Sequence, residues 1–444
     1  MTLLNRRQTL LAAGSLAFAW PARADEEGLQ PLLDARLKVE GVALAAGRLR
    51  SGKAEFAGAA ARGTQPGADS VFEYGSITKT FTALLLADAV VRGQLKLDDA
   101  VEAVLPDGLR LRDSLGQPLR WRDLATHRSG LPRLPDNMTP ARVDDPYADY
   151  DWASLRLFLK GWQPRIARDT VFGYSNLGFG LLGHALALRE DTDYATLLTR
   201  RVLMPLGLGE HIGFARPGLL QGHDAQGKPV PAWHFLGVTA GAGALHGSAR
   251  GLLRYGQAAL GGYEHPLREA FALCLRPHAA GSAPINPVGL AWLLAPAGDR
   301  TLYNHDGATA GFSSSLWLDP SRGAAGVVLA NAQVPVTDLA MHAVDASLPL
   351  QDRAALRQPS LTLAPAQVQP LAGVYAMNPQ FKLRVRADGA RLFAQATGQG
   401  EFELFGKAER RFFARVAVLE IEFDADGQAL TLYQGGGTAR FVRE

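Results

Sequence analysis

The feature that most constrains the fold is a change of pattern near the end of the 444-residue chain. Beyond it, apolar and polar residues alternate through several short runs, with Asp-Gly pairs at 388–389 and 426–427. Such alternation predicts half-buried β-strands, and Asp-Gly is a strong signal for a hairpin turn. We therefore expect three parts in the mature chain: a large domain over residues 25–350, a Gln-, Ala- and Pro-rich linker over 351–367, and an all-β domain over 368–444.

The large domain mixes helical and strand patterns. Apolar residues recur at helical spacing over residues 77–91, and a second apolar helix is expected after Asn176. Three strand-like runs lie within 301–331, and a final helical run covers 336–348. This order predicts an α+β domain in which helices flank an antiparallel sheet. The long polar loop over residues 131–151 has a length that is typical of functional loops.

The first 24 residues have the pattern of an export signal. Arg6 and Arg7 precede an apolar run, and Ala22 and Ala24 have the small-residue spacing of a cleavage site. The paired arginines slightly favour twin-arginine export over the ordinary secretory route. We expect cleavage near Ala24 and an exported, periplasmic protein. The remaining sequence has no apolar run long enough to span a membrane.

The charge balance of the chain does not indicate an anionic partner. Arg6, Arg7 and Arg23 account for the whole formal net charge of +3, so the chain from Asp25 onward is formally neutral. Nothing in that balance favours nucleic acid or an anionic membrane as a partner. Cys274, the single cysteine, lies in an apolar helical pattern, and we expect a buried and unreactive thiol.

Several common motifs are missing from the sequence or occur in the wrong context. There is no H-E-x-x-H and no paired-cysteine spacing, so no metal site is predicted. There is no G-x-S-x-G, which argues against an ordinary α/β-hydrolase. Residues 178–183 match G-x-G-x-x-G but lie inside a helical pattern, which is wrong for a dinucleotide site. We expect neither a metal nor an organic cofactor.

The stretch "FEYGSITK" (72–79) contains a candidate nucleophile and its base. Ser76 and Lys79 are three residues apart, so they share one face of a helix. A serine needs an adjacent base, and a lysine whose pKa is lowered by burial can act as one. The amide of Ser76 is available to a developing oxyanion if it begins the helix. Taken alone, the same pair also fits an exposed serine and lysine.

Two further stretches favour the catalytic interpretation. "GYSNLGFGLLG" contains Tyr174 and Asn176, and "NHDGATAGFSS" begins with residues 304–308. With Ser76 and Lys79 they resemble, in order and spacing, the S-x-x-K, Y-x-N and K-T-G motifs of the serine β-lactamase and penicillin-binding protein superfamily. The flanks "LATHRSGLP" and "GALHGSARGLLRY" also resemble class C β-lactamases and their relatives. The resemblance covers about residues 30–350 and implies the β-lactamase/transpeptidase-like fold, an antiparallel sheet with a helical subdomain.

The resemblance also implies roles for individual residues. Ser76 would be acylated, with Lys79 as its proton partner. Tyr174, kept partly ionised by nearby cations, would pass a proton to the leaving nitrogen. Four further residues would bind the substrate. Asn176 would bind the acyl amide, and His305 and Gly307 belong to the third motif. The amide of Ala308 would form the oxyanion hole together with that of Ser76. For Asn176 a helix-capping role is an alternative or an addition. His127 and His246 are expected to shape loops.

The third motif departs from the pattern, because His305-Asp306-Gly307 stands where relatives have Lys-Thr-Gly. An unperturbed histidine is charged only below a pKa of roughly 6.5. We therefore expect a lower affinity for a substrate carboxylate at neutral pH, and we expect this affinity to rise as pH falls. A second departure, residues 168–170 before Tyr174, receives no functional interpretation.

The sequence thus leaves three functions open. The first is an exported class C β-lactamase-like hydrolase acting on β-lactams or D-Ala-type peptidoglycan peptides through a Ser76 acyl-enzyme. The second is an esterase or D-amino-acid peptidase of the same fold, and the third is a non-hydrolytic penicillin-binding or sensor protein. The domain at 368–444 resembles lipocalin-like modules of this family, which either restrict the active-site cleft or only pack beside it. The oligomeric state is not predicted.

Overall fold

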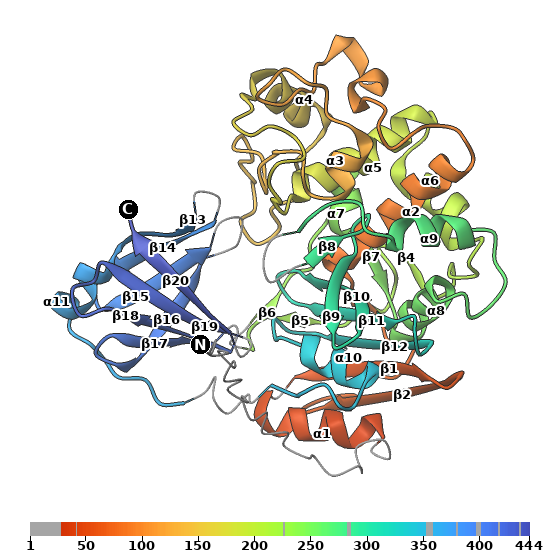
Figure 1. The fold of residues 1–444 in the computed structure, drawn as a ribbon. Coiled ribbons are helices and arrows are strands. Elements are labelled where there is room, and N and C mark those ends of the chain that lie inside the picture. Colours follow the sequence, from red (N-terminus) through yellow and green to blue (C-terminus); the bar gives the residue numbers. More distant parts are fainter. Residues whose placement is uncertain are drawn as a thin grey trace, which may run out of the picture.

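The computed structural model describes most of the chain (Figure 1). The described residues are 28–40, 42–224, 227–281, 286–351, 358–378, 381–396, 401–415, 418–434 and 437–444. The predicted export signal lies outside them. Within them, no helix combines the length and the apolar composition that a membrane span requires.

The large domain is built on one antiparallel sheet. The strand order is β2-β1-β12-β11-β10-β9-β8, so the two ends of the domain's sequence meet in the middle of the sheet. The strands are β1 (Ala43–Arg50), β2 (Lys53–Ala60), β8 (Asn286–Val288), β9 (Leu293–Ala297), β10 (Arg300–Ala308), β11 (Ser313–Asp319) and β12 (Ala324–Ala330). The three runs predicted within 301–331 are therefore the neighbouring strands β10, β11 and β12, as expected.

Both faces of the sheet are buried, which explains why β11 and β12 are apolar or small at nearly every position. Alternate residues of β12 point to opposite sides: Val328 packs toward α1 (Leu29–Glu40) and α10 (Thr337–Val344), and Val327 packs toward α8 (Ala249–Ala259). Figure 1 shows the sheet between these two helical layers. The sheet is therefore a rigid platform for residues at its strand ends.

A helical subdomain lies over one end of the sheet. Its central helix, α2 (Thr78–Val91), is buried from Thr78 to Ala89, and α5 (Asn176–Arg189) packs against it. The remaining helices and short strands of the domain are α3 (Trp121–Ala125), α4 (Trp152–Gly161), α6 (Tyr194–Leu198), α7 (Ala240–Gly243), α9 (Arg268–Leu275), β3 (Phe72–Glu73), β4 (Ile212–Phe214), β5 (Gly222–His223), β6 (Pro229–Val230) and β7 (Leu245–Gly247).

Two sequence interpretations are confirmed inside these helices. The G-x-G-x-x-G match lies within α5, where a Cβ on Gly180 would come 2.4 Å from the carbonyl oxygen of Val238, so the glycine permits close helix packing. Cys274 is a free, buried thiol in α9. The loop over residues 131–151 contains no helix or strand.

The C-terminal part is a closed eight-stranded antiparallel barrel, drawn in blue in Figure 1. The short helix α11 (Pro365–Val368) precedes its strands, which are β13 (Gly373–Asn378), β14 (Phe381–Asp388), β15 (Arg391–Ala396), β16 (Phe402–Ala408), β17 (Arg411–Ala414), β18 (Leu419–Phe423), β19 (Ala429–Gln434) and β20 (Gly437–Arg443). Gly389 and Gly427 occupy hairpin turns with positive φ, as the Asp-Gly pairs predict.

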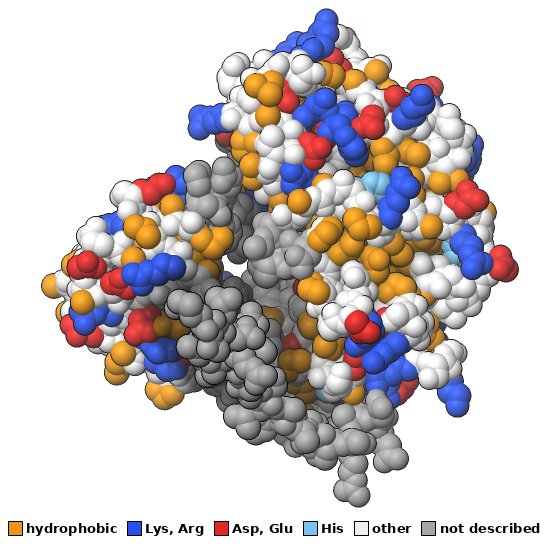
Figure 2. Space-filling model, viewed as in Figure 1, with side chains coloured by type: hydrophobic (Ala, Val, Ile, Leu, Met, Phe, Trp, Pro, Cys, Tyr) orange, Lys and Arg blue, Asp and Glu red, His pale blue; other side chains and the backbone are white. Residues whose placement is uncertain are grey.

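The barrel has an apolar interior and a charged exterior. Residues such as Leu392, Ile421 and Phe441 fill the interior. Outside, ion pairs join neighbouring strands, for example Arg391 with Glu403 at 2.8 Å. Figure 2 shows basic and acidic side chains lying side by side on this body. These pairs cover the strands without leaving one sign of charge in excess.

We expect Asp338→Ala to destabilise the large domain. The Asp338 carboxylate on α10 is buried and binds Arg36 of α1, also buried, with a shortest N–O distance of 2.5 Å. Removing one partner of a buried pair leaves an unpaired charge, so the free energy of unfolding should fall by about 3–5 kcal/mol. Chemical denaturation followed by tryptophan fluorescence measures it. Asp34→Ala, an exposed carboxylate on α1, should cost less than about 0.5 kcal/mol, and equal losses would contradict the assignment.

Candidate active site

The turn that carries Ser76 is pressed against the end of β10. Gly75 has a φ of +51°, and a Cβ there would lie 2.8 Å from the carbonyl oxygen of Ala308. A Cβ on Gly307 would lie 2.1 Å from the carbonyl oxygen of Tyr74. Only glycine fits both positions. A Cβ on Gly307 would also lie 3.1 Å from the backbone nitrogen of Ser76, and a Cβ on Gly75 would lie 3.0 Å from that of Ala308. The contact therefore brings close together the two segments whose amides the sequence predicts as oxyanion donors.

Lys79 is fully buried one turn beyond Ser76. Its Nζ donates to Ser76 Oγ at 2.9 Å, to Asn176 Oδ1 at 2.8 Å and to the Ala242 carbonyl at 2.8 Å. Burial, aided by the charge of Arg133, holds the pKa of Lys79 well below its usual value. An amine with a lowered pKa beside a serine hydroxyl is able to take up the serine proton.

Tyr174 stands on the other side of Ser76, half-buried, with its ring centroid 4.9 Å from Lys79 Nζ. Burial raises the pKa of Tyr174 to about 12, although a hydrogen bond with Ser76 and the charge of Arg133 both act to lower it. The expectation that cations keep this phenol partly ionised is therefore wrong, because desolvation outweighs them. In this structure Tyr174 is a neutral phenol that carries a proton.

His127 holds the segment around Tyr174 in place. Its Nδ1 accepts a hydrogen bond from the backbone N–H of Ser175 at 3.0 Å, and its carbonyl accepts one from Gly173 at 2.8 Å. The imidazole also packs on the Tyr174 ring, with 4.3 Å between centroids. This contact agrees with the loop-shaping role expected of His127. His246, in β7, pairs with Glu73 of β3 and is likewise a structural neighbour of the site.

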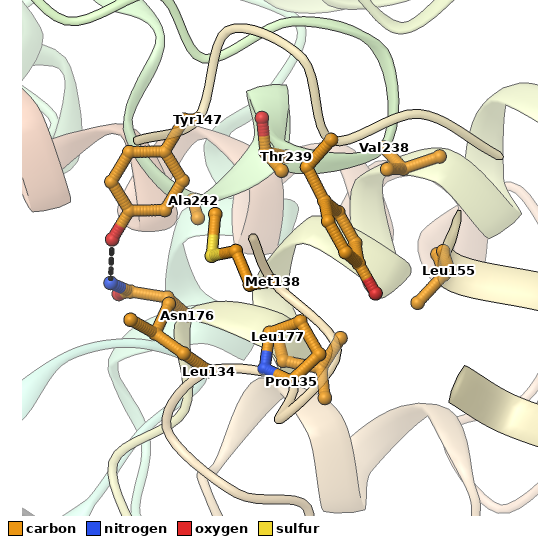
Figure 3. A pocket seen from close by; sticks show the side chains of 11 residues that line it. Leu134, Pro135, Met138, Tyr147, Leu155, Asn176, Leu177, Val238, Thr239 and Ala242 are labelled. Carbon is orange, nitrogen blue, oxygen red and sulfur yellow. Dashed lines mark hydrogen bonds between the residues drawn. The ribbon is translucent and has the colours of Figure 1, made fainter. Parts of the chain in front are cut away.

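Asn176 is the first residue of α5 and links three parts of the site. Besides accepting from Lys79, its amide donates to Tyr147 Oη at 2.9 Å, the bond drawn in Figure 3. An apolar pocket lies beside this pair. The capping role weighed for Asn176 is wrong: Ser175 is the N-cap, and its Oγ accepts from the Gly178 N–H at 2.8 Å.

His305 is buried on β10, facing the site, and its ring centroid is 6.4 Å from that of Tyr174. Its Nδ1 lies 2.7 Å from the Asp306 carbonyl, which can only accept, so Nδ1 carries the proton. Burial and the charge of Lys79 lower the pKa of His305 to about 3. The imidazole is therefore neutral from mildly acidic pH upward. The expected gain of positive charge as pH falls through about 6.5 is wrong.

Strand alternation sends Asp306 to the other side of β10. Its carboxylate accepts hydrogen bonds from Ser315 Oγ at 2.5 Å and from Thr337 Oγ1 at 2.6 Å. This side chain is held between β11 and the start of α10.

The structure also explains the second departure from the family pattern. Asp169, in the left-handed region at φ +62°, binds Arg128 Nε at 2.9 Å and fixes the segment that leads to Tyr174.

Sequence reasoning missed Tyr147 and Glu73. Tyr147 lies in the loop over residues 131–151, and the length of this loop was the only sign in the sequence that it contributes to the site. The Tyr147 ring stacks on that of Phe235, with 4.0 Å between ring centroids. Glu73 is buried in β3 just before the nucleophile turn. It accepts hydrogen bonds from the Trp233 N–H and from the Thr309 hydroxyl, next to Ala308. Burial raises the pKa of Glu73 to about 7.

The described residues contain no group of three His, Cys, Asp or Glu side chains placed to hold a metal ion. The structure brings Ser76, Lys79, Tyr174 and Asn176 together from two separate stretches of the chain.

Comparison with known proteins agrees with this geometry. The family model described as Beta-lactamase matches residues 29–348, well over half of the chain. The chain belongs to the beta-lactamase family. Its fold is the β-lactamase/transpeptidase-like fold with a closed barrel at the C-terminus.

Three similar proteins illustrate the range of the family. Penicillin-binding protein 4 of Amycolatopsis lactamdurans is 28% identical over 335 residues, which cover 69% of this chain and 84% of that protein. A class C beta lactamase from Rhodobacter sphaeroides has a TM-score of 0.61 at 25% identity, covering 72% of this chain and 97% of that one. The D-alanine carboxypeptidase AmpC from Burkholderia cenocepacia has a TM-score of 0.61 at 25% identity, covering 72% and 98%.

We expect Glu73 to make the domain less stable as pH rises from 4.5 to 7. The ordinary pKa of glutamate is 4.5, whereas that of Glu73 is about 7 in the folded state. In this window the folded state retains a proton that the unfolded chain has lost, so the stabilising contribution present below pH 4.5 disappears by pH 7. The loss is on the order of 3 kcal/mol.

Glu73→Gln should remove this part of the pH dependence. Denaturation curves between pH 4.5 and 8 for wild type and variant measure it as a difference between the two proteins. Glu264→Gln, which changes an exposed carboxylate, should retain the wild-type dependence. Parallel curves for wild type and Glu73→Gln would contradict the raised pKa.

Proposed function

We propose that the protein is an exported class C β-lactamase-like serine hydrolase. It cleaves β-lactams or D-Ala-type peptides through an acyl-enzyme on Ser76. The observation that carries the proposal is the 2.9 Å hydrogen bond between Ser76 and a fully buried Lys79 whose pKa is held low. Family membership supports the reaction class. The sequence pattern of residues 1–24 supports export to the periplasm.

The site residues divide the acylation step between them. The Ser76 oxygen bonds to the substrate carbonyl carbon while its proton passes to Lys79 in its neutral amine form, which the lowered pKa makes accessible. The carbonyl oxygen becomes negative and binds the amides of Ser76 and Ala308. As the carbon–nitrogen bond breaks, Tyr174 gives its phenolic proton to the leaving nitrogen. The Lys79 ammonium then returns a proton to the Tyr174 oxygen, which restores both groups.

Deacylation repeats these transfers with water as the nucleophile. The water oxygen bonds to the acyl carbon while the neutral Lys79 amine accepts a proton from the water. The Lys79 ammonium then gives a proton to the Ser76 oxygen as the bond between that oxygen and the acyl carbon breaks. The neutral Tyr174 of the free site suits acylation, because a phenol with a pKa of about 12 still carries the proton that the leaving nitrogen needs. Asn176 is placed to bind the acyl amide through the group that now binds Tyr147.

Two other functions use the same residues. An esterase or D-amino-acid peptidase is favoured by the neutral His305, which does not supply the third-motif cation for a lactam carboxylate. A penicillin-binding or sensor protein would form the acyl-enzyme without turnover, and one similar protein is named as penicillin-binding. The barrel either restricts substrates at the active-site cleft or only packs on the catalytic domain.

We expect a fluorescent penicillin to label the mature protein transiently at Ser76. Ser76→Ala should abolish labelling, a loss of at least about 10³-fold in acylation rate, because the nucleophile is removed. Gel fluorescence against time and intact-protein mass measure both. Ser114→Ala, an exposed serine, is the matched control. Labelling that survives Ser76→Ala would contradict the site. Stable labelling would favour the binding protein, and cleavage of short esters alone would favour the esterase.

We expect Gly307→Ala to slow acylation far more than it weakens binding. The added Cβ would meet the Tyr74 carbonyl at 2.1 Å, which forces β10 away from the nucleophile turn and separates the two oxyanion donors. Loss of one such donor costs about 10²–10³ in rate. Single-turnover acylation of Ser76 separates rate from affinity. Gly161→Ala, at the open end of α4, should change neither, and a Gly307→Ala protein that acylates normally would refute the contact.

A further inference from the structure

The site needs a permanent positive charge to hold an anionic substrate, and its third motif does not provide one. His305 is neutral and its Nε2 is buried without a hydrogen-bond partner among the described residues. Lys79 is engaged inside the site with three acceptors. We propose that Arg133 is the substrate-binding cation, and that it recognises a carboxylate on the acyl part of the substrate. This inference rests on the proposed function and adds to it a preferred substrate class.

The backbone of Arg133 is fixed at the rim of the site. Its carbonyl accepts hydrogen bonds from the N–H of Asn176 at 3.0 Å and from that of Leu177 at 3.2 Å, which joins it to the first turn of α5. The side chain is exposed, and its guanidinium carbon lies 5.2 Å from the centre of the Tyr174 ring. The cation therefore lies one side chain away from Ser76, which Tyr174 contacts.

The charge of Arg133 acts on the groups that line the site. It lowers the pKa of Lys79 and His127, which disfavours further positive charge there, and it opposes the rise in the pKa of Tyr147 and Tyr174. All four groups therefore lie within reach of the charge of Arg133. A guanidinium keeps its charge throughout the working pH range and matches a carboxylate with two parallel hydrogen bonds.

The two sides of the site differ in charge, which decides where an anionic group fits. On the β10 side the third motif supplies the neutral His305, and the neighbouring Asp306 carboxylate, bound to Ser315 and Thr337 on the other side of the strand, adds no positive charge. On the α5 side Arg133 stands next to Asn176, the residue placed to bind the acyl amide. A substrate whose reacting carbonyl lies at Ser76 therefore directs its acyl chain toward Arg133. Acyl donors that end in a free carboxylate, a few bonds from the reacting carbonyl, fit this polarity.

Matched substrates test the charge separately from the chemistry. The mono-4-nitrophenyl ester of glutaric acid carries a free carboxylate, and 4-nitrophenyl 4-carbamoylbutanoate carries a neutral amide of nearly the same shape. We expect wild type to prefer the charged ester in kcat/KM by about five- to tenfold, mostly through KM, after subtraction of spontaneous hydrolysis. Arg133→Gln should reduce this preference to about one. Arg133→Lys should keep part of it, and Arg133→Glu should invert it.

The substitutions leave the backbone bonds to α5 in place, so folding is retained. Arg62→Gln is the matched control, because Arg62 is exposed after the edge strand β2, with three strands between β2 and β10. It should keep the wild-type preference. Carbenicillin and benzylpenicillin form a second pair, which differ by one acyl carboxylate, and their acylation rates should respond to Arg133→Gln in the same direction.

The inference is overturned if Arg133→Gln leaves the charged-to-neutral ratio unchanged, or if it slows both members of each pair equally. Cleavage of the neutral ester by wild type shows that the hydrolase itself is active, so a failure of the proposed function is seen separately. If neither ester is cleaved, equilibrium binding of the two to Ser76→Ala protein, with and without Arg133→Gln, gives the same comparison without turnover. Equal affinities for both esters in the Arg133-containing protein would then refute it.

Discussion

The site depends on the backbone contact between the turn at Gly75 and the end of β10 at Gly307. There is no space for a side chain at this contact, so the nucleophile and the strand are set at backbone distance from each other. The buried sheet fixes β10, and the buried helix α2 fixes the turn. The proposed oxyanion donors, nucleophile and base therefore have positions that follow from the packing of the sheet and of α2. Preorganisation of this kind is what electrostatic stabilisation of a transition state requires.

Desolvation sets the protonation states around this contact. Lys79, Tyr174 and His305 are all shifted toward their neutral forms by burial. These surroundings favour loss of the proton from the amine and the imidazole and retention of the proton on the phenol. The substrate-binding positive charge that we propose comes from outside this buried set. Arg133 lies at the rim, where a guanidinium remains hydrated and keeps its charge.

The sequence was sufficient for the fold, and the structure brings residues of the three motifs close together. Helical spacing over residues 77–91 and alternation in the barrel reflect local geometry, which the structure confirms in α2 and β13–β20. The protonation states were not predictable, because the sign of the pKa shift at Tyr174 and His305 depends on burial by distant segments. Ser175 and Asn176 are both good capping residues, and only the three-dimensional turn decides between them. Glu73, Arg133 and Tyr147 have no motif; contacts with residues far away in the chain bring them to the site.

The bond between Lys79 and the carbonyl of Ala242 links catalysis to helix packing. That acceptor belongs to the main chain of α7, so no replacement of the Ala242 side chain deletes it. Its position depends on α7 lying against α5, where a Cβ on Gly183 would come 3.0 Å from the Cα of Gly241. Substitution of the Ala242 side chain therefore leaves the hydrogen-bond acceptor of Lys79 in place. The position of this acceptor is sensitive to bulk introduced at a helix crossing that touches neither the nucleophile nor the substrate, and natural variation in turnover within this fold can therefore originate there.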